Sequence, residues 1–115
     1  MLTTANSMLT NSTTPPTYAE VMDAQKLHEQ SPNDLSLFKN FRSLKYQFLS
    51  QPKLLSLLES VARTYRKHGL EHSELVNEGY VGLDHALTRF DPTKQTQFST
   101  YAVNWIKEFI RKALV

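Results

Sequence analysis

Apolar residues recur every three or four positions through most of the chain after residue 34, which is the periodicity of amphipathic α-helices. The first predicted helix begins at Leu35, and three more run over about 53–67, 72–90 and 98–115. Helix-breaking residues lie between them, at Ser50-Gln51-Pro52, Gly69 and Asp91-Pro92. Because the chain shows neither the alternation typical of β-strands nor an internal repeat, the pattern predicts an all-α fold, a compact bundle of about four helices.

Two glycines interrupt the third predicted helix. Gly79 and Gly82 lie well inside the apolar pattern, where each costs about 1 kcal/mol of helix stability relative to alanine. Glycines retained at such positions favour a close approach of another helix.

The first 34 residues have a different composition. Met1 to Thr17 is rich in Thr, Ser, Asn and Pro, and such a segment cannot bury enough apolar surface to offset the entropy of ordering. Thr17 and Glu20 have the spacing of a capping box, so a short helix over 18–30 is compatible with the sequence. We therefore expect residues 1–34 to be a mostly disordered extension and residues 35–115 to be the folded helical domain.

The formal charge of +2 is unevenly distributed. Residues 1–34 hold one lysine against four acids, or −3, and residues 35–115 hold twelve Lys and Arg against seven acids, or +5. The expected folded domain is therefore mildly basic, which matters only if the cations gather on one surface. The absence of cysteine excludes disulfides and thiolate metal sites. No apolar run approaches membrane-spanning length, so we expect a cytoplasmic protein without a membrane partner.

The last predicted helix has two distinct faces. Its inward positions are Ala102, Trp105, Ile106, Phe109, Ile110 and Ala113. On the outer side Tyr101, Asn104, Glu108 and Arg111 are spaced three, four and three, so they form a ridge that could lie against the base edges of a nucleic acid. An ordinary amphipathic helix with a solvated polar face explains the same spacing.

Three segments of the second half carry a resemblance to a known family. They are ARTYRKHGL (62–70), ELVNEGYVGLDHALTRFDP (74–92) and FSTYAVNWIK (98–107). In this order and at this spacing they resemble region 2 of bacterial RNA polymerase sigma factors of the sigma-70 family. The resemblance implies a helical domain that binds core RNA polymerase and then recognises and melts the minus-ten element of a promoter.

The resemblance implies a polymerase-binding surface on the third predicted helix, which would contact the coiled coil of the largest catalytic subunit. The matching positions are Glu74, Asn77, Glu78, Tyr80 and Asp84. Independently of the family, Glu74, Asn77 and Glu78 fall within one helical turn and form an acidic patch suited to a basic partner. A solvated helix face explains this patch equally well from spacing alone.

The resemblance also implies a DNA-binding surface for the single-stranded nontemplate strand. An aromatic residue at Tyr101 would capture a flipped base, with Phe90, Asp91, Lys94 and Thr100 around it. Lysine and arginine side chains nearby are suited to phosphates. The full set expected to bind DNA is Phe90, Asp91, Lys94, Thr100, Tyr101, Asn104, Trp105, Lys107, Glu108, Arg111 and Lys112.

Departures from the primary sigma pattern indicate a specialised member. Asn104-Trp105 stands where primary factors carry two tryptophans, and Glu108 and Arg111 stand where they carry glutamine and threonine. Glutamate accepts a hydrogen bond from cytosine and arginine donates to guanine. We therefore expect an alternative sigma factor with weaker intrinsic melting and a different preference at the upstream base pair of the element.

The sequence leaves other functions to consider. A helical co-factor that docks on polymerase, or one subunit of a split sigma factor without independent DNA recognition, fits the same helices. Because the sequence given ends at Val115 without sigma regions 3 and 4, it predicts an N-terminal fragment or a short form that works with a second sigma polypeptide; an anti-sigma factor is a further candidate partner. We expect no metal, because His68 and His72 lack a third ligand. We also expect no enzyme activity, catalytic residue or cofactor, because the sequence has no phosphate-binding glycine loop, nucleophile elbow or activated nucleophile pair.

Overall fold

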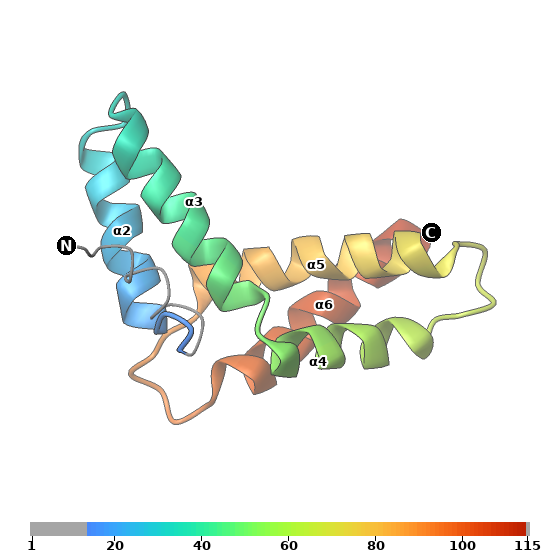
Figure 1. The fold of residues 1–115 in the computed structure, drawn as a ribbon. Coiled ribbons are helices and arrows are strands. Elements are labelled where there is room, and N and C mark those ends of the chain that lie inside the picture. The colour runs from blue at the N-terminus through green and yellow to red at the C-terminus, as the bar shows by residue number, and fades with distance from the viewer. Residues whose placement is uncertain (1–13, 115) are drawn as a thin grey trace. The chain divides into compact units, whose positions relative to one another are not determined.

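The computed structural model describes residues 14–114, which form five α-helices (Figure 1). The helices are α2 (Tyr18–Gln30), α3 (Leu35–Leu49), α4 (Pro52–Arg63), α5 (His72–Arg89) and α6 (Phe98–Leu114). The predicted all-α fold is confirmed, since residues 14–114 contain no β-strand, and residues 35–114 hold four helices, the number expected there. None of these helices is long and apolar enough to cross a membrane. The disorder expected within residues 1–34 falls partly on residues 1–13, which lie outside the described part of the chain.

The chain divides between Gln51 and Pro52 into two compact units. In the first unit, α2 and α3 pack together as a helical hairpin (Figure 1). The ring of Tyr18 lies edge-on to that of Phe48, with centroids 6.1 Å apart. The composition placed a boundary between residues 34 and 35, whereas residues 18–30 form a helix that packs on α3.

Side-chain caps define where both helices of the hairpin begin. The Thr17 hydroxyl accepts a hydrogen bond from the Glu20 amide (3.2 Å), and the Glu20 carboxylate accepts one from the Thr17 amide (2.7 Å). The capping box is present, and residues 18–30, for which the sequence left both helix and disorder open, are helical. Asp34 caps α3 by accepting from the amide and hydroxyl of Ser36, at 3.0 and 2.7 Å. These hydrogen bonds, that of the Ser36 hydroxyl first, lower the pKa of Asp34.

In the second unit, α4, α5 and α6 bury a shared apolar core (Figure 1). Its buried side chains are Leu54, Leu58, Val61, Ala62, Leu75, Leu83, Ala86, Leu87, Ala102, Ile106 and Ile110. The inward face predicted for the last helix is confirmed at its centre by Ala102, Ile106 and Ile110. Trp105 and Phe109 are half-buried at the edge of this core.

The two glycines of α5 allow the close helix contact that their positions predicted. A Cβ atom at Gly79 would lie 2.5 Å from Cδ1 of Leu58, on α4. One at Gly82 would lie 2.5 Å from the carbonyl oxygen of Trp105, on α6. Because both distances are shorter than real Cβ contacts, a side chain at either position would force its neighbour to shift: the end of the Leu58 side chain at Gly79, and the main chain of α6 at Gly82.

The end of α4 differs from the prediction. The sequence placed it near Lys67, but the helix ends at Arg63 and a series of tight turns follows. The hydroxyl of Thr64 donates to the carbonyl of Val61 (2.7 Å), and the Thr64 amide donates to the same oxygen (3.1 Å). This carbonyl is therefore occupied by local contacts, which compete with continuation of the helix. Lys67 and Gly69 then adopt left-handed backbone angles, with φ of 73° and 105°.

Candidate nucleic-acid interface

The second unit brings three aromatic side chains together where α5 ends and α6 begins. The ring of Tyr101 lies 5.5 Å from that of Phe90, and Phe90 is 5.4 Å from Phe98 in an edge-to-face contact. The Tyr101 hydroxyl donates to the main-chain carbonyl of Arg89 (3.2 Å). All three rings are half-buried. The tyrosine ring is therefore fixed at both its edge and its hydroxyl while part of it stays accessible to solvent.

The loop after α5 is braced by Asp91. Its carboxylate accepts from the amide of Thr93 (2.9 Å) and from the Thr93 hydroxyl (2.6 Å). These bonds, that of the hydroxyl first, lower the pKa of Asp91 below its ordinary value of 3.8. The amide of Lys94 donates to the main-chain carbonyl of Asp91 (3.2 Å), so the loop turns tightly there. Lys94 and Thr100 are both exposed.

The ring of Trp105 packs against neighbouring side chains of α5. Its ring lies 4.4 Å from that of His85 in an edge-to-face contact, and the guanidinium of Arg89 lies 5.9 Å from its centroid. His85 is half-buried, and its ring also lies 5.3 Å from that of Phe109. Asn104, the preceding residue, is exposed. Of this adjacent pair, Asn104 is therefore the more accessible side chain.

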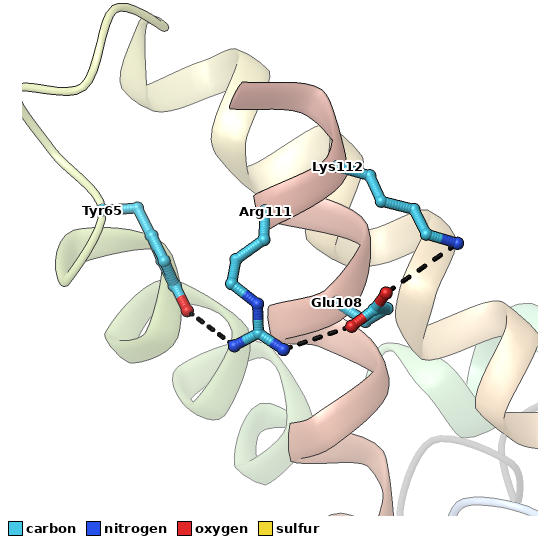
Figure 2. Close-up of polar contacts among 4 residues, drawn as sticks. All are labelled: Tyr65, Glu108, Arg111 and Lys112. Carbon is cyan, nitrogen blue, oxygen red and sulfur yellow. Dashed lines mark hydrogen bonds and ion pairs between the residues drawn. The ribbon is translucent and has the colours of Figure 1, made fainter. Parts of the chain in front are cut away.

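Two residues of the predicted ridge on α6 contact each other directly (Figure 2). One terminal nitrogen of Arg111 donates to the Glu108 carboxylate (3.2 Å), and the other donates to the hydroxyl of Tyr65 (3.4 Å). The other carboxylate oxygen of Glu108 lies 3.9 Å from Nζ of Lys112. The hydrogen bond to Tyr65 and then that to Glu108 raise the pKa of Arg111. Lys107, the remaining cation of this surface, is half-buried.

The residues expected to bind polymerase all lie on α5. Glu74 and Asn77 are exposed, and Glu78, Tyr80 and Asp84 are half-buried. The Glu74 carboxylate also accepts from the amide of Glu71 (2.9 Å), so it helps to cap the first turn of α5. The acidic patch at the start of α5 is therefore accessible to a partner, and part of it is held in place by the helix end.

The histidine pair considered for zinc is separated by other contacts. Nε2 of His72 lies 2.8 Å from the Glu59 carboxylate, and the ring of His68 lies 6.4 Å from that of Tyr65. Among residues 14–114, no group of three or more His, Cys, Asp or Glu side chains could hold a metal ion.

Two residues that hold side chains of the candidate DNA-binding surface were not identified from the sequence. They are Tyr65 and Arg89. Tyr65 lies beyond the end of α4 and reaches a residue 46 positions away, so no local pattern could indicate the contact. Arg89 acts through its main-chain carbonyl, which carries no sequence signal.

Comparison with known proteins places this helical unit in a class of transcription proteins. The family model described as sigma-70 region 2 matches residues 53–115, more than half of the chain. Over 60 residues, or 52% of this chain, the sequence is 50% identical to the RNA polymerase sigma-C factor of Nostoc sp. and 47% identical to the probable RNA polymerase sigma-C factor of Synechocystis sp.. The same length is 42% identical to the RNA polymerase sigma factor SigA of Lactococcus lactis.

The chain belongs to the sigma-70 region 2 family. The matched segment covers 14%, 15% and 16% of the length of these three relatives, in the order given above. The family match begins at residue 53, one residue after the start of the second compact unit.

Proposed function

We propose that this chain acts as a sigma-factor domain that binds core RNA polymerase and recognises and melts the minus-ten element of promoters. The family match over residues 53–115 and the relatives named as RNA polymerase sigma factors support the general role. The observation that carries the DNA-binding part is the half-buried ring of Tyr101, fixed between Phe90 and the carbonyl of Arg89.

Base capture by Tyr101 follows from the physical chemistry of stacking. A base flipped out of a duplex loses stacking worth a few kcal/mol, and an aromatic side chain restores about 1–3 kcal/mol for an unpaired base. The ring then favours the single strand over the duplex, so melting follows from differential binding without ATP hydrolysis. A ring held at its edge and hydroxyl has less conformational entropy to lose on binding.

Polymerase binding is assigned to the polar face of α5, around Glu74, Asn77 and Glu78. The exposed Glu74 carboxylate, the half-buried Glu78 carboxylate and the Asn77 amide, close together on α5, complement a basic or amide-rich helical partner. The proposed partner surface is the coiled coil of the largest catalytic subunit. This part of the proposal is separate from base capture, because Glu78 lies on α5 and Tyr101 on α6.

The first experiment measures DNA binding. The full chain bound to core polymerase is mixed with a fluorescent single-stranded nontemplate minus-ten oligonucleotide, and separately with the duplex. Tyr101→Ala should weaken single-strand binding about 5- to 150-fold, which is the equivalent of about 1–3 kcal/mol. The control is Tyr46→Ala, an exposed tyrosine of α3. Equal single-strand affinity for wild type and Tyr101→Ala would contradict base capture.

The second experiment measures polymerase binding by pull-down of core enzyme. Glu78→Lys should weaken capture, whereas Tyr101→Ala should leave it unchanged. Glu29→Lys, a matched charge reversal at an exposed residue of α2, is the control. Polymerase binding that is retained together with no affinity for the single strand would identify the chain as a polymerase-binding co-factor or split-sigma subunit. If neither ligand is bound, the proposed function is wrong.

The proposal extends to promoter choice. Asn104 stands next to Trp105 where primary sigma factors carry a second tryptophan, so one stacking side chain is missing. Glu108 and Arg111 replace the glutamine and threonine that would face the upstream base pair in those factors. We therefore infer that the chain acts as an alternative sigma factor with weak intrinsic melting of the promoter. Binding to phosphates through Lys94, Lys107 and Lys112 would also make affinity fall as salt rises. A salt-independent affinity would contradict the phosphate contacts.

A further inference from the structure

The guanidinium of Arg111 is held by groups from two different parts of the chain (Figure 2). Nη2 donates to Glu108, one turn earlier on α6, and Nη1 donates to the hydroxyl of Tyr65, in the turn after α4. The two anchors bind different nitrogens of one planar group. Since the plane of a guanidinium is rigid, two such contacts fix both its position and its direction.

The contact with Tyr65 is what distinguishes this arrangement from an ordinary surface pair. An exposed ion pair between Glu108 and Arg111 on one helix is weak and leaves the side chain mobile. Tyr65 is itself half-buried, and its amide donates to the carbonyl of Ala62 (3.0 Å), which fixes the turn that carries it. The hydroxyl therefore presents a fixed acceptor to Arg111.

Glu108 is less suited than Arg111 to contact a base. One of its carboxylate oxygens accepts from Arg111, and the other lies 3.9 Å from Nζ of Lys112. A cytosine amino group would have to compete with these two cations. Arg111 uses two of its five N–H groups in these contacts, and its side chain is 55% exposed. Donors therefore remain on an oriented and accessible guanidinium.

We propose that Tyr65 and Glu108 are positioning residues that hold Arg111 as the group that recognises guanine at the upstream base pair of the minus-ten element. Guanine presents two acceptors, O6 and N7, in the major groove, and an oriented guanidinium matches both. This inference rests on the proposed function, because it assigns the specificity of the same α6 surface. It differs from the sequence-based expectation, in which Glu108 and Arg111 each contacted a base.

The test measures base preference rather than affinity alone. The full chain bound to core polymerase is titrated with four promoter fragments that differ only at the upstream base pair. Wild type should prefer the fragments with guanine. Tyr65→Phe keeps the ring and removes the hydroxyl, and it should reduce this preference about fivefold, the equivalent of about 1 kcal/mol for one hydrogen bond. Arg111→Lys, which cannot bind both anchors, should reduce the preference further than Tyr65→Phe does.

A double variant separates positioning from simple packing. Tyr65→Phe combined with Arg111→Lys should have no more effect on base preference than Arg111→Lys alone, because the hydroxyl acts only through the guanidinium. Tyr46→Phe removes a hydroxyl from an exposed tyrosine of the first unit and should change nothing. Additive losses in the double variant would overturn the inference.

Two further outcomes would also overturn it, and one concerns the proposed function instead. If Tyr65→Phe lowers the unfolding temperature and leaves the base preference unchanged, the contact only supports the fold. If wild type shows no preference for guanine although Tyr101→Ala still weakens single-strand binding, the assignment of Arg111 is wrong and base capture stands. If Tyr101→Ala also has no effect, the proposed function itself fails.

Discussion

Replacing Gly82 with alanine should force α5 and α6 apart. The new Cβ atom would lie 2.5 Å from the carbonyl oxygen and 2.9 Å from the carbonyl carbon of Trp105. Ordinary van der Waals contact begins at 3.4 Å, so the shorter distance falls about 0.9 Å below it. Because the opposing atoms belong to the main chain of α6, no side-chain rotation can relieve the overlap.

The expected loss of stability can be worked out from these contacts. Overpacking costs about 1–3 kcal/mol, and the rigid main chain places Gly82→Ala near the upper end. Alanine returns about 1 kcal/mol through its higher helix propensity. The net decrease in the free energy of unfolding is then about 2 kcal/mol, or roughly 8–16 °C in Tm for a unit of this size.

Urea unfolding followed by tryptophan fluorescence measures this change at the contact itself. Trp105 is the only tryptophan of the chain, and its main chain faces Gly82. Gly79→Ala is the matched control, because the nearest atom to its Cβ is the flexible end of Leu58. It should cost less than about 1 kcal/mol after the same gain in propensity. The reasoning is refuted if Gly82→Ala is as stable as wild type or Gly79→Ala is the more damaging.

Three further predictions concern the core, a loop and a cap. Leu58→Ala should lower the free energy of unfolding by about 2–5 kcal/mol, since Leu58 is 2% exposed; a urea midpoint equal to that of Leu55→Ala, at a 40% exposed residue, would contradict this. Thr93→Val should raise the pKa of Asp91 toward 3.8 by removing a hydroxyl donor, measured by NMR titration. The stability that this carboxylate supplies is present above pH 3.8 and is lost as the pH falls through its lower folded pKa. If the titration of Asp91 is the same in Thr93→Val and wild type, the Thr93 hydroxyl is not the cause of the lowered pKa. Thr17→Ala should speed amide exchange in the first turn of α2 about fivefold, for a cap worth about 1 kcal/mol, and unchanged protection would show that the cap is not needed.

Much of the fold follows from local signals in the sequence. Four of the five helices begin at the predicted residue, because capping side chains and apolar periodicity act over a few positions. Gly79 and Gly82 also indicated a close helix contact, although not which helices make it. The end of α4 could not be predicted, because Thr64 favours a tight turn where the apolar pattern continues.

The candidate site was only partly accessible to sequence reasoning. The family motif indicated Tyr101 and its neighbours, and the structure adds what holds them. The contact between Tyr65 and Arg111 joins residues far apart in the chain, and no periodicity encodes it. The packing of Trp105 against His85 was not predicted for a similar reason, because the sequence does not show which side chain of another helix lies beside a histidine.

Arg89 performs two separate tasks with two separate parts of its structure. Its carbonyl accepts the Tyr101 hydroxyl, and its guanidinium lies over the indole of Trp105. The first task belongs to the peptide backbone, so any exchange at position 89 that preserves the helix also preserves the anchor of the tyrosine. Evolution can therefore vary the charge beside the tryptophan without disturbing the aromatic ring next to it. Substitutions of the side chain at position 89 can therefore be tolerated while the ring of Tyr101 keeps its geometry.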